Sequence, residues 1–132
     1  SDRAVRLRNA EINPVWSEAQ FELGYQCWLE KDLDCTVRSY RKALEADPKN
    51  SQALVNMGAI LIEQGDYRQA KALLEKALTV APDAALIYHN LAVIATQTGE
   101  EKEKIPEWNK KYEELSLVEK KKDYRLGAFR TQ

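Results

Sequence analysis

The chain has 132 residues, enough for one domain with a buried core but too few for two. Lysine and arginine total 20 against 21 aspartates and glutamates, and the net charge of −1 argues against the strongly positive face that nucleic-acid binding requires. No apolar run approaches the roughly 18 residues that span a bilayer, and a composition of 31% charged and 44% hydrophobic residues is typical of a soluble helical protein.

The N-terminal segment carries charges every few residues and lacks the apolar stretch of a signal peptide. The sequence also begins without methionine, so we expect a processed chain or a fragment of a longer protein. These features leave the compartment open, with the cytoplasm favoured. The first predicted helix covers residues 3–12.

An internal repeat organises the rest of the chain. Its period of 34 residues is marked by three prolines, Pro14, Pro48 and Pro82. Apolar positions between the prolines recur at the same interval, as in the set Leu23, Met57 and Leu91. Such self-similarity is the signature of a repeat protein.

The first full unit, 17–50, is predicted to contain helices over 17–30 and 33–46. Ser17 followed by Gln20 forms a capping box that would open the first helix. Asp32 is placed to cap the second, because its short acceptor side chain can satisfy free backbone N–H groups. Gly24 is predicted to face Thr36 and Ala43, which would let the two helices approach closely.

The two cysteines, Cys27 and Cys35, lie in this first unit. They form no CxxC motif, and His89 is the only histidine, so the chain has too few ligands for a Cys/His metal site. We expect two buried, unpaired thiols, since free cysteine commonly packs as a small hydrophobe.

The second unit, 51–84, repeats this arrangement with predicted helices over 51–64 and 67–80. Asp66 is expected to cap the second helix. Apolar residues then follow at the three- and four-residue steps of one helical face. Gly58 is predicted to face Ala70 and Ala77 across the helix pair.

The third unit, 85–105, is degenerate, with one predicted helix over 85–98. Pro106 is tolerated only in the first turn of a helix, so the last helix, 106–126, should start near Ile105 and leave "GEEKEK" as a loop. Its apolar face comprises Trp108, Tyr112 and Leu115. The polar run after it suits a C-terminal capping helix and tail, 106–132.

The repeat "L54-x2-M57-G58-x2-L61 … A70-x3-L74 … P82" resembles the tetratricopeptide repeat, whose period is also 34 residues. The unit 17–50 resembles it through Leu23, Gly24, Tyr40, Ala43 and Pro48. In this reading residues 1–14 are the last helix of a preceding, partial repeat. The resemblance implies an all-α fold, an α-solenoid of helix-turn-helix repeats forming a short right-handed superhelix.

In that family the first helix of each repeat lines a concave groove. The resemblance therefore implies that a peptide or amphipathic helix binds at Phe21, Tyr25, Trp28, Gln52, Val55, Asn56, Ala59, His89, Asn90 and Val93. A second apolar stripe on helix 17–30, beside the expected core stripe of Leu23, Gly24 and Cys27, agrees with this. The terminal helix 106–126 could instead cover the groove.

Asn56 and Asn90 are the most specific of these positions. In some members of the family such asparagines bond the backbone of an extended peptide, since an amide offers both a donor and an acceptor. The alternative is that each asparagine bonds a neighbouring helix of the chain itself.

The family's carboxylate clamp for acidic chaperone tails is not matched here. Of the five clamp positions, only one has the expected residue; they hold Phe21, Tyr25, Asn56, Leu86 and Asn90. We therefore expect a partner more apolar than such a tail.

An enzymatic function is not indicated. His89 has no second histidine beside it, and no serine or cysteine nucleophile lies near a base. The acidic run Glu100, Glu101 and Glu103 and the lysines 120–122 are expected to be solvated.

The sequence thus predicts a non-enzymatic protein-interaction module without cofactor, metal, nucleic acid or membrane insertion. Two alternatives remain. One is a scaffold that self-associates through residues 3–14 and the 106–126 helix, and the other is a regulatory domain of a larger protein.

Overall fold

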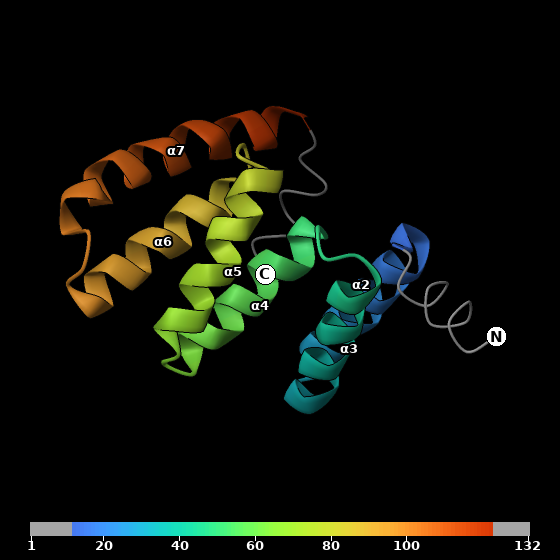
Figure 1. Cartoon of the computed structure of the whole chain (residues 1–132). Coiled ribbons are helices and arrows are strands. Elements are labelled where there is room, and N and C mark those ends of the chain that lie inside the picture. Colours follow the sequence, from blue (N-terminus) through green and yellow to red (C-terminus); the bar gives the residue numbers. More distant parts are fainter. Residues whose placement is uncertain (1–11, 123–132) are drawn as a thin grey trace. The chain divides into compact units, whose positions relative to one another are not determined.

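The computed structural model describes residues 12–122, and within this part every regular element is a helix. The helices are α2 (Pro14–Leu29), α3 (Leu33–Ala46), α4 (Ser51–Glu63), α5 (Tyr67–Val80), α6 (Ala85–Thr98) and α7 (Ile105–Lys122), with a short 3₁₀ helix, η1, at Lys102–Lys104 (Figure 1). The chain divides into two compact units, 1–57 and 58–132. Helix α4 runs through the division.

Three predicted helices, 33–46, 67–80 and 85–98, are confirmed to the residue. The helix predicted at 51–64 ends one residue earlier, and the last helix begins at Ile105, as Pro106 required. Residues 3–11 and 123–126 lie outside the described part of the chain, which leaves the predicted helix 3–12 and the end of 106–126 untested.

The start of the helix predicted at 17–30 is wrong. Helix α2 begins three residues earlier, with Pro14 in its first turn and the Asn13 side chain accepting from the Trp16 amide at 3.0 Å. Ser17 is buried inside the helix, where its hydroxyl donates to the Ala43 carbonyl at 2.6 Å and accepts from the Asn50 side chain at 2.8 Å. The Ser17 hydroxyl therefore links separate parts of the first unit by hydrogen bonds, and it does not cap the start of a helix.

The two aspartate caps are confirmed. The Asp32 carboxylate accepts from the Cys35 amide at 3.1 Å at the start of α3. The Asp66 carboxylate accepts from the Gln69 amide at 3.2 Å at the start of α5. Each carboxylate satisfies an N–H group that has no partner within the helix.

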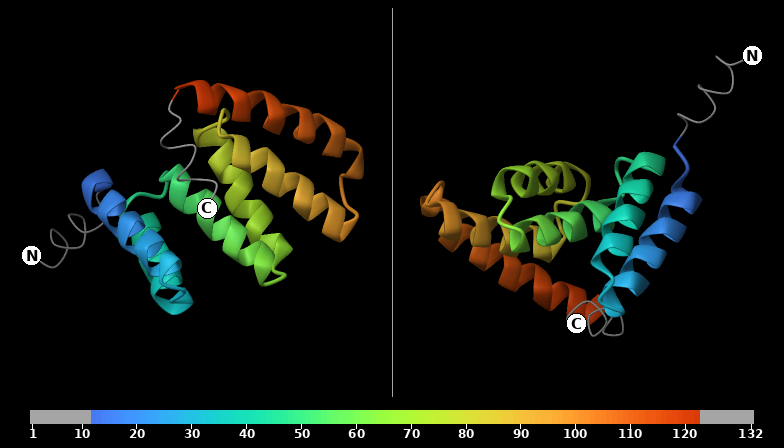
Figure 2. Two further views of the ribbon diagram at one scale, coloured as in Figure 1. Left: turned by 180° about the vertical axis from the view of Figure 1, so that it is seen from behind. Right: turned by 90° about the horizontal axis from the view of Figure 1, so that it is seen from below.

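In the first unit, α2 and α3 form a hairpin and lie side by side in both views of Figure 2. Gly24 packs at this crossing, and its nearest neighbours there are Tyr40 and Ser39; Thr36 and Ala43 are not among them. A Cβ atom added at Gly24 would lie 2.6 Å from two carbons of the Tyr40 ring. The close approach of the two helices at Gly24 is therefore confirmed, and Tyr40 is the nearest residue there.

The prediction of two free thiols is also wrong, because a disulfide joins Cys27 to Cys35. Their Cα atoms are 5.8 Å apart, within the range that a disulfide spans. The eight-residue spacing carries the chain from the end of α2, through a tight turn, into the first turn of α3. The bond thus links the two helices of the first hairpin.

In the second unit, α6 packs against both α5 and α7. Gly58 lies next to Leu74 of α5, with the Ala70 carbonyl oxygen also close, while Ala77 is not among its nearest neighbours. The buried core of this unit includes Leu74, Ile87 and Leu91. Helix α6 is apolar around most of its circumference because it has a helix on two sides.

Candidate functional site: a cleft between helices α6 and α7

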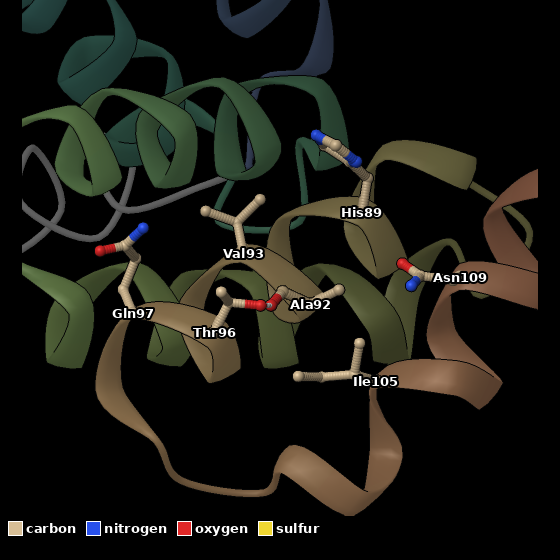
Figure 3. A pocket seen from close by; sticks show the side chains of 7 residues that line it. All are labelled: His89, Ala92, Val93, Thr96, Gln97, Ile105 and Asn109. Carbon is tan, nitrogen blue, oxygen red and sulfur yellow. Dashed lines mark hydrogen bonds between the residues drawn. The ribbon is translucent and has the colours of Figure 1, made fainter.

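A cleft of about 210 Å³ opens between α6 and α7 in the second unit (Figure 3). Helix α6 contributes five lining residues and α7 contributes two; they are His89, Ala92, Val93, Thr96, Gln97, Ile105 and Asn109. Two of these, His89 and Val93, are among the predicted groove residues. Part of the predicted groove therefore lies beside the terminal helix, and the two form this cleft together.

The lining combines apolar and hydrogen-bonding groups. Ala92, Val93 and Ile105 supply apolar surface, while the imidazole of His89 and the amides of Gln97 and Asn109 supply polar atoms (Figure 3). The Thr96 hydroxyl donates to the Ala92 carbonyl at 2.9 Å, so its hydrogen is already used. The two amides each offer a donor and an acceptor.

Two contacts far apart along α7 fix this helix beside α6. The Tyr112 ring lies tilted against His89, with ring centroids 5.1 Å apart. Further on, the Glu119 carboxylate accepts a hydrogen bond from the Ala85 amide at 3.1 Å. Helix α6 has no capping side chain of its own at this end, so Glu119 supplies the acceptor that the helix start requires.

The turn that leads into α7 is held by a small ionic network. Glu101 has a left-handed backbone conformation, with φ 56°, and its carboxylate accepts from Lys104 at 2.7 Å and also from Lys71 of α5. These hydrogen bonds, from Lys104 and then Lys71, lower the pKa of Glu101 to about 2. The Lys104 ammonium also lies 5.9 Å from the centroid of the Trp108 ring.

This network corrects the expectation for the acidic run 99–104. Glu101 is half-buried and paired, whereas Glu100 and Glu103 are exposed as predicted. The segment predicted as a loop contains η1, one 3₁₀ turn that precedes α7. Its geometry places Ile105 at the edge of the cleft and, one turn later on the same face, Asn109.

The predicted groove residues of the first unit behave differently from one another. The Phe21 side chain is buried and stacks on Tyr40, with ring centroids 5.3 Å apart, and Val55 is buried as well. Phe21 and Val55 are therefore not available at the surface to contact a bound peptide. Trp28 and Gln52 are exposed, and Tyr25 is half-buried.

Asn56 follows the alternative interpretation. Its amide donates to the Tyr40 hydroxyl at 3.1 Å, so it bonds a neighbouring helix within the first unit. Burial raises the pKa of the Tyr40 hydroxyl, and the hydrogen bond with Asn56 partly offsets that rise. In sequence terms the tyrosine that marks the repeat and the asparagine 16 residues later form a structural pair.

The remaining predicted positions lie on α4 and α6. Ala59, Asn90 and Val93 are half-buried, and His89 is exposed. Asn90 does not line the cleft, so the structure groups His89 with Val93 and leaves Asn90 outside. Sequence reasoning missed Ile105 and Asn109 as site residues, although Pro106, which fixes where α7 starts, was the signal that could have located them.

Comparison with known proteins settles the family. The profile described as Tetratricopeptide repeat matches residues 28–92 and 61–103, together more than half of the chain. The chain belongs to the tetratricopeptide repeat family. Its helix hairpins and its all-α solenoid fold are those of this family, whose members serve as protein–protein interaction modules.

Similar proteins occur in different kinds of organism. The human protein O-mannosyl-transferase TMTC1 is 37% identical over 69% of this chain and 10% of its own length. The type IV pilus assembly protein PilF of Pseudomonas aeruginosa is 34% identical over 86% of this chain and 44% of its own. The chain thus spans less than half of either relative.

A solved structure supports the fold. That of a mutant of the protein MamA has a TM-score of 0.62 and 25% identity to this chain, and the match covers 75% of this chain and 72% of that one. Within the described residues no helix is long and apolar enough to cross a membrane. The same residues contain no group of three or more His, Cys, Asp or Glu side chains that could hold a metal ion.

Proposed function

We propose that the cleft between α6 and α7 binds a short segment of a partner protein, and that the chain acts there by binding alone. The observation that carries this proposal is the lining itself, an apolar floor edged by two amides and an imidazole. A partner's apolar side chain would bury against Ala92, Val93 and Ile105. The amides would hydrogen-bond the partner's backbone beside that side chain.

The size of the cleft supports a peptide over a cofactor. Sites for small organic ligands commonly enclose about 300–1,000 Å³, and this cleft, at about 210 Å³, is smaller. It suits one or two side chains of a segment that otherwise lies on the surface. Its polar edge adds specificity without a strong positive charge, so the proposed partner is more apolar than an acidic chaperone tail.

The relatives support a shared module and not a shared reaction. One is named as a transferase and another as a pilus assembly protein, yet both are similar to this chain over more than two thirds of its length. A binding module explains how the same segment occurs in proteins named for such different roles. A regulatory domain within a longer protein, the alternative expected from the sequence, would use the same cleft.

The test begins with peptides selected from a random library on the 132-residue chain. Affinity of a selected peptide is then measured by fluorescence anisotropy for Val93→Asp and Asn109→Ala, with Lys76→Ala, an exposed change on α5, as the matched control. We expect each cleft variant to weaken binding by about tenfold or more, which corresponds to about 1.4 kcal/mol. Unchanged affinity in both, or no selected peptide, would contradict the proposal.

A further inference from the structure

The turn that joins α2 to α3 holds a lysine in a backbone conformation that favours glycine. Lys31 has φ 62°, in the left-handed region, where a Cβ atom comes too close to the following carbonyl oxygen. This residue is exposed, and it lies in the first unit, away from the residues that line the α6–α7 cleft. The turn therefore carries a backbone strain that a glycine would avoid.

The internal repeat supplies the unstrained form of this turn. One and two periods after Lys31 stand Gly65 and Gly99, and both have the same left-handed backbone, with φ 78° and 79°. At Gly65, no atom beyond its chain neighbours lies within 4 Å of the place that a Cβ atom would take. The backbone conformation, and not crowding by other residues, is therefore what favours glycine there.

The first two turns also have the same hydrogen bonds. In the first turn the Lys31 amide donates to the Trp28 carbonyl at 3.0 Å. The Asp32 amide donates to the Cys27 carbonyl at 2.9 Å. The second turn repeats both bonds 34 residues later, at 3.0 and 2.9 Å, and this pair of bonds is a common way for a helix to end on a left-handed residue. The two turns thus share their backbone structure and differ in the residue at its strained position.

A second difference is a covalent bond across the first turn. The disulfide joins Cys27 and Cys35, the residues four before and four after Lys31. Both cysteines also take part in the hydrogen bonds of the turn, because Asp32 bonds the Cys27 carbonyl through its amide and the Cys35 amide through its carboxylate, at 3.1 Å. The chain has two cysteines, so the turn at Gly65 has no such bond.

We infer that the disulfide holds the first turn closed against the strain of Lys31, and that its reduction opens this turn. With the bond intact, the end of α2 and the start of α3 stay together. Without the bond, Lys31 can leave the left-handed conformation when the two turn hydrogen bonds and the Asp32 cap break, while the middle of the hairpin stays packed. The turn is thus a redox-sensitive switch in the first unit.

The opening reaction takes two electrons from a dithiol reductant. A thiolate of the reductant attacks Sγ of Cys35, because Cys35 is half-buried and Cys27 is buried. The S–S bond breaks, and the Cys27 sulfur leaves as a thiolate and takes up a proton. The second thiol of the reductant then attacks the mixed disulfide and releases Cys35. Both cysteines end as thiols, and the reductant ends as a disulfide.

Opening the turn changes an apolar surface of the first unit. Trp28 and Leu29 are exposed on the last turn of α2, and Leu33 is exposed at the start of α3. The Trp28 carbonyl is one of the acceptors of the turn, so opening releases the part of α2 that carries these side chains. Trp28 is also one of the predicted groove residues. Reduction therefore removes the fixed position of a residue at which a partner was expected to bind.

Amide hydrogen exchange of the 132-residue chain, with and without a dithiol reductant, tests the inference. We expect reduction to speed exchange in residues 28–36 of the wild type by more than about tenfold, and exchange in the middle of α2 and α3 by less. In Lys31→Gly this increase should be about tenfold smaller, which corresponds to about 1.4 kcal/mol, because glycine adopts the left-handed conformation without strain.

Gly65→Lys is the matched variant, because it places the same strain in a turn that no disulfide crosses. Exchange beside residue 65 should be about tenfold faster than in the wild type, with or without the reductant. Circular dichroism confirms that each sample remains helical. An equal increase on reduction in the wild type and Lys31→Gly overturns the inference. Equal acceleration throughout α2 and α3 also overturns it, since the bond would then hold the whole hairpin, and so does unchanged exchange in Gly65→Lys.

Discussion

Gly24 shows how one missing side chain sets the spacing of the first hairpin. In an exposed helix, Gly→Ala would stabilise by about 0.5–1 kcal/mol, because glycine has more backbone freedom to lose. Here the added Cβ would lie 2.6 Å from the Tyr40 ring. That ring is buried, stacked on Phe21 and bonded to Asn56, so it cannot move away without losing these contacts.

We therefore predict that Gly24→Ala destabilises the protein by about 1–3 kcal/mol, the usual effect of overpacking. Urea unfolding followed by circular dichroism measures the difference. Gln26→Ala, at an exposed position of the same helix, is the control and should change stability by no more than about 0.5 kcal/mol. A more stable Gly24→Ala variant would show that the ring is free to shift.

Predictions for single residues were wrong more often than predictions for whole helices. Ser17 carries the motif of a capping box, yet a tertiary partner, the Ala43 carbonyl, takes its hydroxyl. Leu23 has the pattern of a core residue, yet its side chain is half exposed. Both errors have one physical cause: a local pattern reports what a side chain can do, and distant neighbours decide which option is used.

Whole elements were predicted far better than single contacts. The helices at 33–46, 67–80 and 85–98 have the expected bounds because each is determined locally. Asp32 and Asp66 cap two of them, and Gly99, in the left-handed conformation, ends the third. The disulfide could not be predicted in the same way, since the distance between two thiols depends on how the hairpin closes.

The disulfide joins two adjacent elements and should stabilise their hairpin. Closing a loop as short as the one between Cys27 and Cys35 removes unfolded-state entropy worth about 2–3 kcal/mol. We predict that a reductant lowers the unfolding midpoint of the wild type and has no effect on the Cys27→Ala/Cys35→Ala variant. Urea unfolding with and without reductant measures this, and equal midpoints for the wild type would contradict the prediction.

At the scale of the whole molecule, the resemblance to the tetratricopeptide repeat predicted the fold class and two residues of the candidate cleft. It placed His89 and Val93 on the face of α6 that lines the cleft. It could not place Asn109 there, because the last repeat departs from the pattern at Pro106 and shifts the start of its second helix. Where the repeat is regular, the sequence predicted which face of its helix a residue occupies. Where the repeat is degenerate, only the structure located the residue.

In a repeat architecture, a destabilising substitution should affect mainly the repeat that contains it and the repeats next to it. Each repeat contacts only its neighbours, so stability is close to a sum of local terms. We predict that Gly24→Ala speeds amide hydrogen exchange mainly in α2 and α3. Glu119→Ala removes the acceptor for the Ala85 amide and should speed exchange mainly in α6 and α7, at a cost of about 1 kcal/mol. Hydrogen exchange with mass spectrometry compares both variants with the wild type. Equal acceleration throughout the chain in both would show instead that the 132 residues unfold as one cooperative unit.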